Sequence, residues 1–146
     1  QKNEETESVD IDDLIEEIVK KYDTKKINLN FAAKCKINIR SQAIKRCLSN
    51  LIDNGLAYGE KVLITSKKSI NHLIIFVDDN GSGIPEKEFK NVMKPFYRID
   101  KSRGQNKSGV GLGLSIANDI IRSHGGSIIL EKSSLGGLRV KISLPL

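Results

Sequence analysis

One short stretch, "DDNGSGIP" at residues 78–85, places two carboxylates and two glycines directly after the apolar run "HLIIFV". The same pattern is also typical of a plain turn after a strand. A carboxylate at a strand end, Asp79, could accept a hydrogen bond from an exocyclic amine. Gly81 and Gly83 would let a flat base approach the backbone closely. The stretch is therefore a candidate site for a base such as adenine.

A second candidate is the pair of amides in "NLIDN", where Asn50 and Asn54 are four residues apart. On a helix this spacing places both side chains on one face. Neutral oxygens there could hold a hydrated hard cation such as Mg²⁺, which prefers oxygen ligands and keeps several waters. The alternative is two polar surface residues without a ligand.

The third candidate is "GVGLGLSIAN", where Gly109, Gly111 and Gly113 precede an apolar helical pattern. Backbone N–H groups at the positive end of a helix can bind an anion. A dinucleotide-binding fold would need this motif between its first strand and helix, and a Walker loop would need a Gly-Lys-Ser/Thr ending. Neither condition is met, so the stretch favours phosphate binding by a different fold.

Composition and charge narrow the class of protein. At 146 residues and 38% hydrophobic, the chain can form one domain with its own core. The net charge of +6 comes from scattered lysines and arginines with few aromatics between them, so we expect no nucleic acid partner and favour a polyanionic small molecule. No apolar run approaches the ~20 residues of a membrane span, and no signal peptide is recognisable. Cys35 and Cys47 are expected to be buried reduced thiols, with a metal site or a disulfide as the alternative.

The chain starts at Gln1 and its single methionine is Met93, so we expect it to be part of a longer polypeptide. Residues 1–8 are polar and predict a linker tail, followed by one domain over 9–146. Periodicity predicts three helices, over 9–22, over 41–59 with Ser41 as N-cap, and within 112–126, where Gly125 lies past the helix end. A short helical piece is predicted over 86–93 and a mobile loop over 94–109. Strands are predicted over 26–33 and 35–40, paired with each other, over 61–79 as two strands around a turn, and over 127–134 and 137–146.

Such a pattern predicts an α+β fold, with about five to seven mostly antiparallel strands and three helices on one face. Four stretches in this order, "NLIDNGLAYG", "DDNGSGIP", "KPFYR" and "GVGLGL", resemble the N, G1, F and G2 boxes of the catalytic ATP-binding domain of sensor histidine kinases, most of all the osmosensor EnvZ type. The resemblance covers residues 9–146. It implies a two-layer α/β sandwich, the Bergerat fold, with a flexible lid over ATP.

The resemblance also implies roles for individual residues. Asn54 would coordinate Mg²⁺, Asn50 would assist on the phosphate side, and Asp79 would accept the adenine amine. Around the base, Tyr58 would pack on its face, and Gly81, Gly83 and Ile84 would surround it. Phe96 would anchor the lid, and Arg98 and Arg103 would face the phosphates and share a catalytic role with Asn50. The G2 box would bind the phosphates through Gly109, Val110, Gly111, Leu112, Gly113 and Leu114.

Three positions depart from the family pattern. Gly55 replaces a usual alanine, which should cost about 1 kcal/mol of helix stability. Ala57 replaces a basic residue that meets the phosphates, so that charge would have to come from Lys61, Lys94 or the loop. Leu138 replaces a common threonine near the adenine.

The family implies transfer of the γ-phosphoryl group of Mg-ATP to a histidine on a dimerisation domain. Neither His72 nor His124 stands before an acid on an amphipathic helix, so the acceptor is expected outside this chain. We expect a monomeric fragment of a homodimeric kinase, cytoplasmic and attached to an inner-membrane sensor, with a response regulator as indirect partner. The alternatives are an anti-sigma-type serine kinase and a non-catalytic nucleotide-sensing module. Relatives that hydrolyse ATP carry a glutamate base at the position of Asn50.

Overall fold

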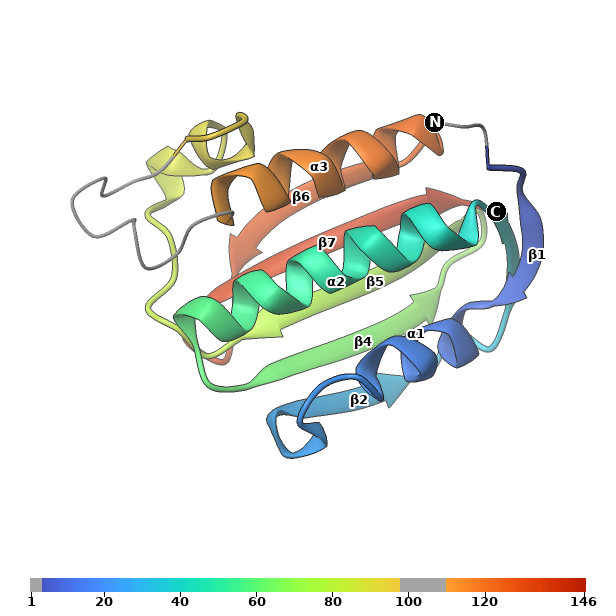
Figure 1. The fold of residues 1–146 in the computed structure, drawn as a ribbon, viewed down its shortest axis with the longest axis horizontal. Helices are drawn as coiled ribbons and strands as arrows, with labels where there is room; N and C mark the ends of the chain where they lie inside the picture. The colour runs from blue at the N-terminus through green and yellow to red at the C-terminus, as the bar shows by residue number, and fades with distance from the viewer. Residues whose placement is uncertain (1–3, 98–109) are drawn as a thin grey trace.

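A computed structural model describes residues 4–97 and 110–146. Within them, a five-stranded sheet has the order β2-β4-β5-β7-β6, and a separate two-stranded sheet pairs β1 with β3. The three α-helices lie on one face of the larger sheet, with α2 and α3 side by side (Figure 1). The elements are β1 (Glu7–Asp10), α1 (Ile11–Val19), η1 (Thr24–Lys26), β2 (Ile27–Phe31), β3 (Lys36–Ile39), α2 (Ser41–Tyr58), β4 (Val62–Lys68), β5 (His72–Asp79), η2 (Glu86–Glu88), η3 (Asn91–Met93), α3 (Val110–Ser123), β6 (Ser127–Lys132) and β7 (Leu138–Pro145).

The predicted fold class is confirmed: within the described residues the larger sheet is antiparallel except for the β2–β4 pair. Strand β7 shows how the sequence builds the core, because Leu138, Val140, Ile142 and Leu144 are buried while the residues between them are partly exposed. This period of two gives β7 one face toward the helices and one toward solvent.

The prediction that the segments 26–33 and 35–40 pair with each other was wrong. Strand β2 pairs in parallel with β4, and β3 pairs with β1. The Ser66 hydroxyl of β4 accepts hydrogen bonds from the backbone N–H groups of Ala32 and Ala33 and donates one to Asp12. This fixes the chain between β2 and β3 against β4. Alternation along a strand predicts its wet face but does not specify its partner.

The N-terminal segment was expected to be linker through Ser8, but its described part belongs to the fold. Glu7 and Ser8 are in β1, and the Glu4 carboxylate accepts hydrogen bonds from the backbone N–H groups of Gln42 (2.7 Å) and Ala43 (3.1 Å). Ser41, expected as the N-cap of α2, is its first helical residue and donates to Glu7 instead. A carboxylate from a distant segment thus fills the capping role, which local sequence does not reveal.

The same end of α2 is tied to α3. The backbone N–H of Arg40, the N-cap residue, donates to Nε2 of His124 at 3.1 Å, and Nδ1 of His124 lies 2.8 Å from the Ile120 carbonyl oxygen. The turn after α3 reverses at Gly125, whose φ of 79° suits glycine. The histidine is therefore structural.

Both cysteines are free, as expected, but Cys35 is only partly buried. Cys47 is buried between α2 and α3, and burial raises the pKa of its thiol to about 12. Among the described residues, none of the helices combines the length and the apolar character of a membrane span.

Candidate functional site

Helix α2 carries both predicted amides toward its C-terminal end. Asn54 is 5% exposed, and within the described residues its buried Oδ1 has no hydrogen-bond partner. Asn50 is half-buried beside the first turn of α3, since a Cβ added at Gly113 would lie 3.8 Å from the Asn50 Cβ. A buried amide oxygen without a partner is costly unless a ligand or water satisfies it. Asn50 on α2 and Gly113 of the G2 box are thus brought together.

Helix α2 is braced on its other side by Tyr22, which follows α1. The Tyr22 hydroxyl donates to Asp53 Oδ1 at 2.8 Å and lies 3.3 Å from the Ser49 carbonyl oxygen. Burial, and then the hydrogen bond to Asp53, raise the pKa of Tyr22 to about 12. The brace holds the backbone turn from which Asn50 and Asn54 project.

Asp79 ends β5 and is 5% exposed. Its Oδ1 accepts hydrogen bonds from the backbone N–H groups of Gly81 (2.9 Å) and Leu138 (3.2 Å), whereas its Oδ2 accepts none within the described residues. Burial raises the pKa of the Asp79 carboxyl, and the two backbone donors oppose this shift without cancelling it. One carboxylate oxygen is held by the protein and the other is left for a donor.

Close packing around Asp79 explains several glycines. A Cβ at Gly81 would lie 2.6 Å from the Tyr58 carbonyl oxygen, and one at Gly55 would lie 2.9 Å from Cγ2 of Val62 and 3.7 Å from Asp79 Oδ2. The distances of 2.6 and 2.9 Å are shorter than real Cβ atoms show, whereas 3.7 Å is an ordinary contact, so a side chain at Gly81 or Gly55 would require the neighbouring atoms to move. The glycine at position 55, a weak helix former, therefore has a packing reason. Gly83 is needed for its φ of 80°.

Asn80 ties the same turn to the loop after α2. Its side-chain Oδ1 accepts hydrogen bonds from the backbone N–H groups of Glu60 (2.8 Å) and Lys61 (2.9 Å). The side chain acts inside the protein as the turn-stabilising group that asparagine often provides. The G1 turn is thereby anchored on both sides of Asp79.

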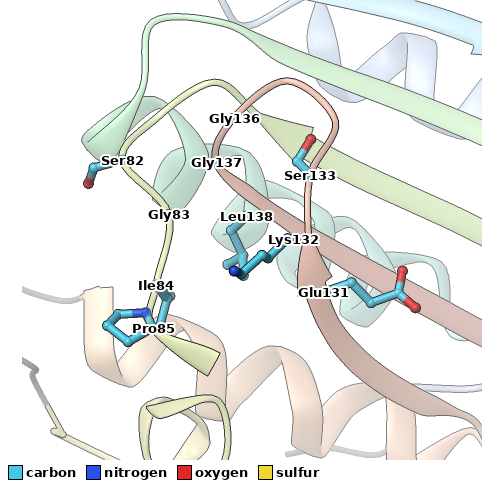
Figure 2. A pocket seen from close by; sticks show the side chains of 10 residues that line it. All are labelled: Ser82, Gly83, Ile84, Pro85, Glu131, Lys132, Ser133, Gly136, Gly137 and Leu138. Atoms are coloured by element: carbon cyan, nitrogen blue, oxygen red, sulfur yellow. The ribbon is translucent and has the colours of Figure 1, made fainter. Parts of the chain in front are cut away.

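A pocket of about 390 Å³ lies between the G1 turn and the hairpin that joins β6 to β7 (Figure 2). Its volume is in the range of small-molecule sites. Ile84 and Leu138 supply apolar surface, and Lys132, at the end of β6, supplies a cation. The hairpin's contribution was missed from the sequence, although its doubled glycine, Gly136 and Gly137, marks a close approach of backbones.

The other predicted residues are placed less centrally. Tyr58, the last residue of α2, is 46% exposed, and Phe96 is 77% exposed with a φ of 65°. Leu114 is buried in the core under α3, and Lys61 and Lys94 are exposed. The backbones of Val110, Gly111 and Leu112 form the first turn of α3. Arg98, Arg103, Gly109 and most of the predicted lid lie outside the described residues.

Comparison with known proteins decides the family. The model of the histidine kinase-, DNA gyrase B- and HSP90-like ATPase family matches residues 39–146. The chain belongs to this ATPase family. The sensor histidine kinase GtrS of Pseudomonas aeruginosa is 36% identical over 144 residues, which are 98% of this chain and 30% of GtrS. The sensor histidine kinase CpxA of Escherichia coli K12 is 37% identical over 105 residues, 71% of this chain and 23% of CpxA.

Solved structures agree with this assignment. The catalytic domain of histidine kinase ThkA has a TM-score of 0.80 at 28% identity, covering 97% of this chain and 95% of its own. The histidine kinase domain of the E. coli osmosensor EnvZ has a TM-score of 0.75 at 28% identity, and the match covers 99% of this chain and 91% of the EnvZ chain. The resemblance to sensor histidine kinase catalytic domains is confirmed. The chain spans less than a third of the length of GtrS and CpxA.

Proposed function

We propose that the chain is the ATP-binding catalytic domain of a two-component sensor histidine kinase. It would transfer the γ-phosphoryl group of Mg-ATP to a histidine on a dimerisation domain outside this chain. The observation that carries the proposal is the polar junction where α2 meets the end of β5. There, the buried Asp79 offers one free carboxylate oxygen, and the buried Asn54 offers an amide oxygen without a partner in the described residues.

Asp79 is proposed to read the base. A carboxylate that keeps one oxygen free can accept a hydrogen bond from the exocyclic amine of adenine, and a base with a carbonyl at that position would face it with another acceptor. The adjoining pocket surfaces of Ile84 and Leu138 are apolar, which suits the face or edge of an aromatic ring. Adenine rather than guanine nucleotides should therefore bind.

Asn54 is proposed as the Mg²⁺ ligand. Its unpaired, buried Oδ1 fits the preference of Mg²⁺ for hard oxygen ligands, with water completing the octahedron. When bound, the ion would neutralise phosphate charge. Asn50, beside the first turn of α3, is placed to orient the phosphate side. The first backbone N–H groups of a helix have no partner within the helix, and the helix dipole is positive at this end, so the N-terminal end of α3 favours an anion.

The chain's own groups would position ATP and balance its charge, which is most of what phosphoryl transfer requires. An attacking imidazole is its own nucleophile, so no general base is needed here. Asn50 cannot take a proton, which disfavours activation of water for hydrolysis. Arg98 and Arg103 are proposed to meet the phosphates, on the resemblance alone. A response regulator as indirect partner, a homodimeric parent and attachment to an inner-membrane sensor belong to the same proposal.

The test is transfer of phosphate. The chain is incubated with Mg-ATP labelled at the γ-phosphate and with a separately supplied dimerisation domain from a similar sensor kinase. The expected result is acid-labile, base-stable label on the acceptor histidine, with little free phosphate. An acceptor carrying His→Ala is the control. Label on serine, or phosphate release without transfer, would overturn the proposal in favour of a serine kinase or an ATPase. Binding of ATP without either would indicate a nucleotide-sensing module.

A further inference from the structure

The β6–β7 hairpin contacts the G1 turn through the backbone of Gly137 and Leu138, next to the Asp79 carboxylate. The Gly137 N–H donates to the Asp79 carbonyl oxygen at 3.2 Å, and the next N–H, that of Leu138, donates to Asp79 Oδ1 at 3.2 Å. The hairpin thus binds both the main chain and the side chain of the residue proposed to read the base.

The contact leaves no room for a side chain on the hairpin. A Cβ added at Gly137 would overlap Asp79 Oδ1 and would lie 2.6 Å from the Gly81 nitrogen and 2.7 Å from the Asp79 carbonyl oxygen. The φ of Gly137 is not among the positive values in the chain's described residues, so its lack of a side chain answers a steric need and not a conformational one. Gly83 and Gly136 line the same pocket (Figure 2) but have positive φ values.

We propose that Gly137 is a positioning residue for base recognition: by admitting the hairpin against Asp79, it commits Oδ1 to the protein and leaves Oδ2 as the acceptor for the adenine amine. A free carboxylate rotates between its two oxygens and reorganises when a donor arrives. One whose Oδ1 accepts two backbone N–H bonds is already oriented, which strengthens discrimination between amine and carbonyl. The proposal rests on the proposed function, since it concerns the same nucleotide.

The arrangement also accounts for the leucine at position 138. In the family pattern a threonine is common there, and Leu138 cannot offer a hydroxyl. The hydrogen bond to Asp79 comes from the Leu138 backbone, however, and does not depend on the side chain. The leucine side chain lines the pocket instead. The carboxylate is therefore oriented by the backbone N–H of Leu138. This N–H reaches Asp79 because Gly137, the residue before Leu138, has no side chain to keep the hairpin away.

The experiment measures discrimination and not affinity alone. Calorimetric titrations in Mg²⁺ compare ATP with inosine triphosphate, which has a carbonyl in place of the amine. Gly137→Ala should reduce the ATP-over-inosine preference by about tenfold, the factor expected when a charge-assisted hydrogen bond is lost. Binding of inosine triphosphate itself should change much less.

Gly126→Ala is the matched control. Gly126 precedes the other end of β6, and its added Cβ would overlap the Ser143 carbonyl oxygen of β7, far along the strands from Asp79. This variant should lower thermal stability as Gly137→Ala does, but it should keep the wild-type ATP-over-inosine preference. An equal loss of preference in both variants would mean that distortion of the strands, and not the orientation of Asp79, is responsible, and would overturn the proposal.

A measurement on the unmodified chain covers the case in which Gly137→Ala does not fold. The Leu138 and Gly81 amides should exchange slowly with solvent before any nucleotide is added, because both donate to Asp79 Oδ1. Exchange as fast as in an open loop would overturn the proposal.

If the wild-type chain fails to prefer ATP, or Asp79→Asn has no effect, the proposed function fails. If the wild-type preference for ATP and the effect of Asp79→Asn are as expected, and Gly137→Ala leaves the ATP-over-inosine preference unchanged, only this inference fails.

Discussion

The two ends of helix α2 use polar groups in opposite ways. At the N-terminal end, Glu4, Glu7 and His124 come from distant segments and form hydrogen bonds with the first residues of the helix. At the C-terminal end, Asn54 and Asp79 are equally buried, yet each keeps an oxygen without a partner in the described residues. In Figure 1 the first end lies beside β1 and the second beside the segment that follows β5.

Buried polar atoms are normally hydrogen-bonded, because leaving one unpaired costs about 1–3 kcal/mol. The N-terminal end of α2 follows this rule at every group just named. The C-terminal end departs from it at the buried Oδ1 of Asn54, and Oδ2 of Asp79 accepts no hydrogen bond within the described residues, which is the pattern expected where a ligand completes the bonding. The comparison therefore separates a structural end from a functional end of one helix.

The largest expected effect is that of Asp79→Asn, which should weaken ATP about 10- to 100-fold, the range for a hydrogen bond to a charged group. Titration with a fluorescent ATP analogue measures it. The same change should raise the melting temperature of the apo protein. Because burial raises the pKa of Asp79 in the folded protein, the protonated carboxyl contributes stability at low pH, and this contribution is lost as pH rises through that pKa. At neutral pH the ionised, buried carboxylate therefore lowers the stability of the folded protein. Unchanged affinity would show that Asp79 is not part of a functional end.

Asn54→Ala should come next, with a loss of about tenfold or more in ATP affinity when Mg²⁺ is present and little loss in its absence. Calorimetry with Mg²⁺ and with a chelator separates the two. Ser49→Ala, on the same helix and away from the site, is a control for general weakening of α2. Equal losses with and without metal would mean that the Asn54 amide is structural, and the two ends of α2 would then not differ in kind.

The N-terminal end should respond in stability alone. Glu4→Gln should lower the free energy of unfolding by about 1 kcal/mol, as expected for loss of a charged helix cap. Denaturant titration measures this free energy of unfolding. The ATP affinity of the folded protein should stay within about twofold of wild type, which is well below the tenfold change that a loss of about 1.4 kcal/mol in binding free energy would cause. Glu5→Gln is a control, because Glu5 is exposed and has no recorded bond in the described residues. A large loss of ATP affinity would show that the two ends are coupled.

The smallest effect is expected at Tyr22, outside neutral pH. Its pKa is raised from 10.0 to about 12, so the neutral hydroxyl favours the folded state. This contribution is fully present below pH 10 and is lost as pH rises through 12, because the unfolded chain ionises first. Tyr22→Phe should flatten the fall in stability across that interval, measured by denaturant midpoints at several pH values. A steeper fall in the variant would contradict the assigned cause.

Comparison of two pairs of strands shows which part of the fold could not be predicted from the sequence. The extents of β4 and β5 followed from alternation and from the turn between them, since their pairing is local. The partners of β2 and β3 lie far along the chain and were predicted wrongly. Likewise, the cap of α2 was assigned to the nearest serine, whereas Glu4 supplies it to residues that are 38 and 39 positions further along the chain. Local pattern specifies an element but does not encode its distant neighbour.

By itself, the sequence determined the residue types and spacings: an amide pair on one helix face, a carboxylate at a strand end and glycines beside both. Only the tertiary structure decided which oxygens are already used. Asp78 and Asp79 are adjacent in sequence and both buried, but Asp78 points to the opposite face of the sheet, where its Oδ1 pairs with Arg139 at 2.9 Å and its buried Oδ2 has no partner among the described residues. Two of the hydrogen bonds that Asp79 accepts come from Gly137 and Leu138, nearly sixty positions away. Such a contact is absent from any local pattern, because it exists only after β5 and β7 have paired.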